Sequence, residues 1–314
     1  MTFGPAIRWG AKITSLDEFG QSLDFFQEQG YDEVDIARMY QHGAQEAFTA
    51  AVGWRKRMHS PKDLRESVET SLRELQTDCV DIFYLHAADR SLPFTETLKE
   101  VDKIYREGKF RQFGLGNFTA FEVAEIVMTC HANAWVRPTI YQPMYNAITR
   151  RIEGELVPAY RRYGLDIVTY NGLAGGLLTG KCDAADATPP EDLTHVDSAY
   201  RARFLRHASL EAVSLIEPVV KAHNLTLVET GLRWLVHHSA LKMRSDSKGN
   251  DGILFGASSL DQLKASLLIF EKGPLPQAVV KALDDGWQIA KTQAPDYWHL
   301  GLTYTYNTCK ALFG

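Results

Sequence analysis

The chain has 314 residues, 45% of them apolar and 23% charged, which is typical of globular proteins and excludes disorder and fibrous repeats. Its formal charge of −5, from 34 basic and 39 acidic side chains, argues against a nucleic-acid-binding surface. Neither a membrane span nor a signal peptide is expected from the apolar pattern. The four cysteines lie far apart without CxxC spacing, so we expect no disulfide framework and no zinc site, and favour a reducing cytoplasm.

Short β-type runs alternate with amphipathic helical stretches along the whole chain. The expected strands are Glu33–Ile36, Val80–His86, Arg111–Leu115, Thr139–Gln142, Ile167–Tyr170 and Ile253–Gly256. The expected helices are Leu16–Glu28, Asp63–Leu75, Thr95–Glu107, Ala120–Ala132 and Leu156–Tyr163. Such repeated βα units with short links predict a parallel sheet. No Gly/Pro/Ser-rich linker divides the chain, so we expect one domain over residues 1–314.

An open doubly wound sheet and a closed (β/α)8 barrel both fit this alternation. Polar residues stand at or just past the C-terminal ends of successive strands, namely Asp35, His86, Asn117, Gln142, Asn171 and Ser258. In a barrel these ends converge on one mouth, whereas in an open sheet only those near the switch point would meet. No G-x-G-x-x-G follows an early strand, so a Rossmann site has no support. The pattern therefore favours an α/β fold of the (β/α)8 TIM-barrel type.

Two strands of this barrel are expected to be short or missing. The interval between Asp35 and His86 leaves room for a further strand, but the stretch from Gly53 to Pro61, after an expected helix at Gln45–Val52, contains no apolar run. At most Met1–Gly4 remains as the stub of a first strand. We therefore expect an incomplete barrel with a short first strand and no third strand.

A carboxylate, a phenol and an imidazole follow two of the strands. Asp35 ends one strand, Tyr40 lies on the loop beyond it, and His86 ends the next strand. Together they form a plausible proton-donating group for carbonyl reduction, because a free tyrosine has a pKa of about 10 and gives up its proton usefully near neutrality only when its phenolate is stabilised. The alternative is that each residue has a purely structural role.

Two turns near the end of the chain are suited to an anion. The glycine-rich segment Tyr170–Lys181 can bring backbone N–H groups close to a phosphate, with Lys181 as the counter-charge. In Gly256–Gln262, a serine at the helix start would leave N–H groups facing an anion. The alternatives are a flexible turn without ligand and simple helix capping. Both turns nevertheless match the usual phosphate site of barrels.

These motifs resemble the aldo-keto reductases, and in particular the branch that contains the aflatoxin-aldehyde reductases and their fungal relatives. The segments that carry the resemblance are Glu33–Tyr40, Asp81–Arg90, Gly114–Phe118, Tyr141–Asn146, Tyr170–Lys181, Tyr200–Phe204, Gly256–Leu263 and Pro295–Trp298. The resemblance implies a (β/α)8 barrel that uses NADPH, without a metal, to reduce an aldehyde or ketone. It implies a small-molecule carbonyl substrate, such as a secondary metabolite or a reactive carbonyl, and either a monomer or a homodimer.

The resemblance also implies roles for individual residues. Tyr40 would be the general acid, Asp35 would hold the catalytic network in place, and His86 would orient the substrate carbonyl. Asn117 and Gln142 would hydrogen-bond the nicotinamide carboxamide. The remaining cofactor-binding positions that it implies are Tyr170, which would stack on the nicotinamide ring, and Leu173, Gly175, Lys181, Gly256, Ser258 and Gln262 around the phosphates. Arg203 or Arg201 would add a cation to these phosphate-binding residues or bind an acidic substrate.

The chain departs from the family pattern in several places. The third strand of the family ends in a Thr-Lys pair whose lysine lowers the pKa of the tyrosine, and no such pair occurs between Trp54 and Pro61. The usual Ser-Asn pair reads Gly116-Asn117, and the usual Asn-Pro-Leu reads Asn171-Gly172-Leu173. The alternative to an active reductase is therefore a catalytically impaired relative that binds a nucleotide or a partner protein.

Overall fold

The computed structural model describes residues 3–5, 11–31, 33–37, 40, 45, 60–180, 203–243 and 249–314. The chain forms two compact units that each draw on separate stretches of sequence. Unit 1 comprises Met1–Asp35, Met144–Gly154 and Val168–Asp296, and unit 2 comprises Ile36–Pro143, Glu155–Ile167 and Tyr297–Gly314. No helix within these described ranges combines the length and the apolar character that crossing a membrane requires.

Unit 2 is built on parallel strands that pair in chain order. These strands are β1 (Val80–Leu85), β2 (Phe110–Gly116), β3 (Ile140–Gln142) and the beginning of β4 (Asp166–Thr169). The register pairs Leu85 with Leu115 and Gly116 with Gln142, so the C-terminal ends of β1, β2 and β3 lie side by side. Each strand end thus brings the residue after it to the same edge of the sheet.

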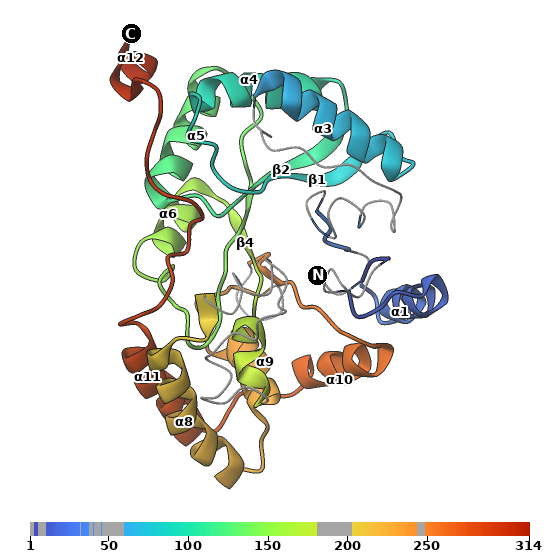
Figure 1. Ribbon diagram of the computed structural model, residues 1–314, viewed down its shortest axis with the longest axis vertical. Coiled ribbons are helices and arrows are strands. Elements are labelled where there is room, and N and C mark those ends of the chain that lie inside the picture. Colours follow the sequence, from blue (N-terminus) through green and yellow to red (C-terminus); the bar gives the residue numbers. More distant parts are fainter. Residues whose placement is uncertain are drawn as a thin grey trace, which may run out of the picture. The chain divides into compact units, whose positions relative to one another are not determined.

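The helices of unit 2 follow one another around these strands, each packed against the next (Figure 1). They are α3 (Pro61–Glu74), α4 (Phe94–Arg106), α5 (Ala120–Ala132) and α6 (Leu156–Tyr163), and the short helix α12 (Thr308–Phe313) belongs to the same unit. Helix α3 begins at a proline behind a capping Ser60, and it buries Leu64, Val68 and Leu72 on one stripe. Gly164 ends α6 in the left-handed conformation that glycine adopts without strain.

Unit 1 contains the remaining elements. They are α1 (Leu16–Glu28), the 3-10 helix η3 (Ala174–Thr179), α8 (His207–Ala222), α9 (Leu227–His237), β5 (Gly252–Ile253), α10 (Leu260–Phe270) and α11 (Gln277–Ala290). The end of β4 pairs in parallel with β5, and helices α8 and α11 pack along each other (Figure 1). Trp234 of α9 is buried, with the guanidinium of Arg150 4.4 Å from its ring centre.

Most of the elements expected from the sequence are present. The bounds of α1, α5 and α6 coincide with the expected helices, and α3 and α4 differ from expectation by one or two residues at each end. Five expected strands appear as β1 to β5, although β5 is only two residues long. The prediction of an α/β protein with a parallel sheet is confirmed.

The strand expected at Glu33–Ile36 was wrong. Residues 33–37 form no strand, and the side chain of Val34 is 45% exposed, contrary to a strand buried on both faces. A strand forms only where a neighbour accepts and donates its backbone hydrogen bonds, and none of the described strands pairs with this segment. Two expectations lie outside the described residues. They are the Gln45–Val52 helix beyond Gln45 and most of the strandless stretch before Pro61.

Replacing Gly114 by alanine should test the close packing of β1, β2 and β3. An added Cβ would lie 2.5 Å from Cδ1 of Tyr84 and 2.9 Å from Cγ2 of Ile140, so the strands would have to move apart. We expect the free energy of unfolding to fall by about 1–3 kcal/mol, measured by urea denaturation. Gly154→Ala is the control, because nothing lies within 4 Å of its added Cβ. Equal losses in the two variants would contradict this packing.

Candidate active site

Tyr40 and His86 come together at the end of β1. Their ring centres are 6.1 Å apart and the rings meet edge to face at 87°. Burial lowers the pKa of His86 below its usual value, so the ring is neutral near pH 7. A neutral imidazole can donate a hydrogen bond from one ring nitrogen, beside a phenol that can donate from its hydroxyl. The structure therefore brings together two of the three residues expected to handle the proton.

Asn117 is held against the backbone of His86. Its Nδ2 atom donates a hydrogen bond to the carbonyl oxygen of His86 at 2.8 Å. The residue is buried and has a φ of +60°, a left-handed conformation that asparagine tolerates better than most residues. Gly116 allows this approach, because a Cβ there would lie 3.2 Å from the His86 carbonyl oxygen. The glycine that replaces the family's usual serine thus fits the tight space between β1 and β2.

Gln142 ends β3 at the same edge of unit 2. The parallel register pairs Gln142 with Gly116, the residue before Asn117. Gln142 and Asn117 are therefore one position out of register at the ends of neighbouring strands. Two carboxamide side chains therefore lie at neighbouring strand ends: Asn117 follows β2 and Gln142 ends β3. Strand β2 pairs with β1, which ends just before His86. Carboxamides offer both N–H donors and oxygen acceptors, which is the donor set that an amide-bearing ligand such as nicotinamide requires.

The other expected site residues lie in unit 1. Asp35 is the last residue of one of its segments, Tyr170 follows β4, and Leu173 directly precedes η3. Arg203 donates from Nη2 to the carbonyl oxygen of Asp296 at 3.0 Å. Lys181 and Arg201, which were expected to supply cations, lie outside the described residues.

The two anion-friendly turns are present in unit 1. In η3, Gly175 and Gly176 have φ values of +67° and +95°, so this backbone path depends on glycine. At the start of α10, the backbone N–H and the hydroxyl of Ser258 both bond to Oε1 of Gln262, at 3.0 and 2.5 Å. Gly256 precedes this turn. The glycine-dependent backbone of η3 is of the kind that can approach a phosphate, whereas Gln262 occupies both donors of Ser258 in this structure.

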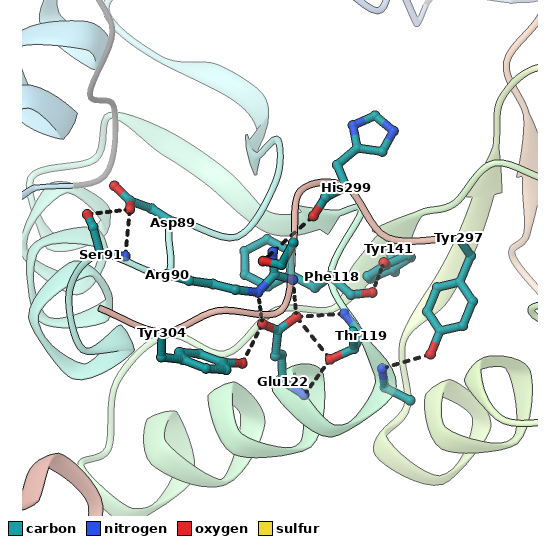
Figure 2. A network of polar contacts seen from close by, with 12 residues as sticks. Asp89, Arg90, Ser91, Phe118, Thr119, Glu122, Tyr141, Tyr297, His299 and Tyr304 are labelled. Carbon is teal, nitrogen blue, oxygen red and sulfur yellow. Dashed lines mark hydrogen bonds and ion pairs between the residues drawn. The ribbon is translucent and has the colours of Figure 1, made fainter. Parts of the chain in front are cut away.

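A polar cluster that sequence reasoning missed surrounds Glu122 at the start of α5 (Figure 2). The guanidinium of Arg90 binds both carboxylate oxygens of Glu122, at 2.7 and 2.9 Å, and both side chains are buried. Burial would lower the pKa of Arg90, but the hydrogen bonds and charge of Glu122 outweigh it and raise that pKa. Glu122 also accepts the backbone N–H and hydroxyl of Thr119 as part of a capping box, and the hydroxyl of Tyr304.

Comparison with known families assigns the chain to a class. The sequence pattern of the aldo/keto reductase family matches residues 6–288. The chain therefore belongs to the aldo/keto reductase family, whose fold is the (β/α)8 barrel. It is an oxidoreductase that reduces a carbonyl group with a nicotinamide cofactor, and the resemblance inferred from the motifs is confirmed.

Individual relatives point to the same branch. Aflatoxin B1 aldehyde reductase member 2 of Rattus norvegicus is 39% identical over 331 residues, which cover 94% of this chain and 89% of the relative. The protein of the same name from Homo sapiens is 37% identical, covering 92% of this chain and 89% of the relative. Aldo-keto reductase pigE of Monascus ruber is 34% identical, covering 94% of each chain.

The comparison with the rat protein also bears on the missing segment. Its alignment runs over 331 positions, more than the 314 residues of this chain, so the chain lacks residues that the relative has within the aligned region. The internal gap expected after Trp54 stays a prediction, because the length of the alignment does not place these residues. The residues around that position, 46–59, lie outside the described part of the structure.

The lowered pKa of His86, which is partly removed from water, should make the protein sensitive to acid. Its pKa lies below the usual 6.5, so below that pH the folded state binds fewer protons on this ring than the unfolded state, and stability falls. We expect this ring to cost up to about 1.4 kcal/mol per pH unit below its usual pKa. His86→Gln should remove that part of the loss in thermal denaturation compared at about pH 7.5 and about pH 5.5.

The control for this measurement is His131→Gln, at the exposed end of α5. This variant should keep the pH dependence of the unchanged protein. An acid sensitivity of His86→Gln equal to that of the unchanged protein would contradict a partly buried neutral ring.

Proposed function

We propose that the chain reduces an aldehyde or ketone with NADPH, using Tyr40 as the general acid. The observation that carries the proposal is the edge-to-face pair of Tyr40 and a neutral, partly buried His86. The cofactor supplies the hydride. Tyr40 donates the proton to the oxygen that becomes the alcohol, and His86 donates a hydrogen bond that orients the same oxygen. Asp35 is proposed to hold this network in place.

We propose that the nicotinamide end of the cofactor binds in unit 2. The amide side chains of Asn117 and Gln142 support this assignment, because they supply donors and acceptors for its carboxamide. Tyr170 is proposed to stack on the nicotinamide ring. The phosphate-binding set is proposed to comprise Leu173, Gly175, Lys181, Arg203, Gly256, Ser258 and Gln262. We also propose that these elements act as one domain over residues 1–314.

The substrate and the compartment are proposed on separate grounds. Relatives named as aflatoxin B1 aldehyde reductases support an aldehyde as the substrate class. That this aldehyde is a secondary metabolite or a reactive carbonyl is proposed from the family resemblance of the motifs. Three described cysteines, Cys79, Cys130 and Cys309, are unpaired thiols, which supports a reducing cytoplasm.

Tyr40→Phe should separate chemistry from binding. Removal of the hydroxyl keeps the ring beside His86 but removes the proton donor, so we expect turnover to fall by at least about 100-fold. NADPH affinity, measured by fluorescence titration, should stay within about twofold of the original value. Tyr105→Phe, on an exposed face of α4, is the control and should keep full activity.

The same measurement distinguishes the impaired alternative, which is favoured by the absence of a Thr-Lys pair between Trp54 and Pro61. If the unchanged protein binds NADPH but reduces no aldehyde, the chain is a nucleotide-binding relative. If Tyr40→Phe remains active, Tyr40 is not the acid.

Cofactor choice is the second test of this function. NADPH should bind at least about tenfold more tightly than NADH, because the two glycine- and serine-rich turns and Lys181 offer N–H groups and a cation to its extra phosphate. Competitive fluorescence titration with both cofactors measures this ratio. Equal affinities for NADPH and NADH would show that these turns do not bind the extra phosphate of NADPH.

A further inference from the structure

The C-terminal segment of unit 2, residues 297–305, crosses the loops that follow β1 and β2. We call this segment the tail. The loop after β1 carries His86 and Arg90, and the loop after β2 carries Asn117 and Thr119. Figure 2 shows the tail running over Arg90, with the ring of His299 pointing away from the Arg90–Glu122 pair.

The tail is tied to both loops through its backbone. Nη1 of Arg90 donates to the carbonyl oxygen of His299 at 2.9 Å, and the carbonyl oxygen of Arg90 accepts the N–H of Thr305 at 3.0 Å. The N–H of His299 donates to the carbonyl oxygen of Asn117 at 3.1 Å. The tail is therefore hydrogen-bonded directly to Asn117, whose side chain donates to the backbone of His86.

One side chain of the tail reaches the buried ion pair. The hydroxyl of Tyr304 donates to Oε1 of Glu122 at 2.6 Å, the same oxygen that accepts Nε of Arg90. Burial and the neighbouring carboxylate raise the pKa of Tyr304, so its hydroxyl remains a donor at any working pH. Its ring also packs edge to face on Phe94, with the ring centres 6.4 Å apart. This packing does not depend on the hydroxyl.

These contacts form one continuous chain from Tyr304 through Glu122, Arg90, His299 and Asn117 to His86. We propose that Tyr304 and Glu122 are positioning residues that clamp the tail over the two loops and thereby fix Asn117 and His86 for carbonyl reduction. The inference rests on the proposed function. A hydrogen bond to a buried carboxylate is among the stronger ones in proteins, and Asn117 holds its left-handed backbone while bonded to the tail.

Tyr304→Phe in the full-length chain is the decisive variant, because it keeps the ring packing and removes only the hydroxyl. We expect the exchange of the backbone amides of His299 and Thr305 to accelerate by about tenfold, measured by hydrogen–deuterium exchange. Exchange in α11 of unit 1 should not change. The melting temperature should stay within a few degrees, which separates local release of the tail from general unfolding.

Turnover gives the second readout. Loss of positioning should lower kcat for an aldehyde by about tenfold, while the KM for NADPH stays within about twofold. Tyr306→Phe is the matched control. This tyrosine directly follows the tail and packs against Tyr304, and its hydroxyl has no hydrogen-bond partner among the described residues. That variant should leave the exchange rates and kcat unchanged. A Tyr304→Phe protein with faster tail exchange but unchanged kcat would overturn the positioning role.

A third readout does not depend on activity. NMR signals of the His86 ring should shift in Tyr304→Phe and not in Tyr306→Phe, because the clamp reaches His86 through Asn117. If the unchanged protein reduces no carbonyl, the proposed function fails, while the exchange and NMR measurements still decide the clamp. Unchanged tail exchange and unchanged His86 signals in Tyr304→Phe would overturn the clamp itself.

Discussion

The buried ion pair between Arg90 and Glu122 is the constraint on which the site-bearing edge of unit 2 depends. Its side chains are only 4% and 0% exposed, so both charges have given up most of their contact with water. Such a pair is stable only when further hydrogen bonds satisfy the remaining donors and acceptors. Here they come from Thr119 at the start of α5 and from the C-terminal segment, while Arg90 itself lies on the loop after β1. These three parts must therefore be in position together.

The same constraint explains the backbone around the strand ends. Asn117 and His86 are joined by a side chain-to-backbone hydrogen bond, and the carbonyl of Asn117 is occupied by the N–H of His299. Gly116 leaves space for this arrangement next to β1. The side chains at the end of β2 are thus oriented by main-chain contacts from distant segments. The parallel strands bring these residues to one edge of the sheet. The hydrogen bonds made by the loops after the strands then orient the side chains.

Local signals in the sequence predicted much of the fold. The bounds of α5 follow from its apolar spacing, its capping Thr119 and the glutamate three residues later, all of which act within a few residues. The Glu33–Ile36 strand was not predicted correctly, because β-type composition describes a preference and a strand also needs a neighbour. Tyr40 and His86 were expected to meet where strand ends converge, and their rings are in contact. The strand expected before Tyr40 is nevertheless not formed by residues 33–37, so strand convergence does not explain this contact.

The cluster around Glu122 was beyond sequence reasoning for a physical reason. Arg90 lies 32 residues and Tyr304 lies 182 residues from Glu122, and no periodicity links positions so far apart. One local signal was present: Glu122 occupies the third position of the capping box, yet Arg90 gives it a buried cation as well. A charged capping residue on an otherwise apolar helix face is a reason to look for a distant partner.

The interleaving of the two units has a consequence for how the protein is made. Unit 2 takes residues 297–314 from the end of the chain, and unit 1 takes both Met1–Asp35 and Val168–Asp296. A chain emerging from the ribosome therefore holds Arg90 and Glu122 long before the tyrosine that completes their hydrogen bonds is synthesised. Closing loops of this length is slow compared with forming helices. Until that tyrosine arrives, burying the pair leaves one hydrogen bond unmade, so this edge of unit 2 is completed only at the end of synthesis.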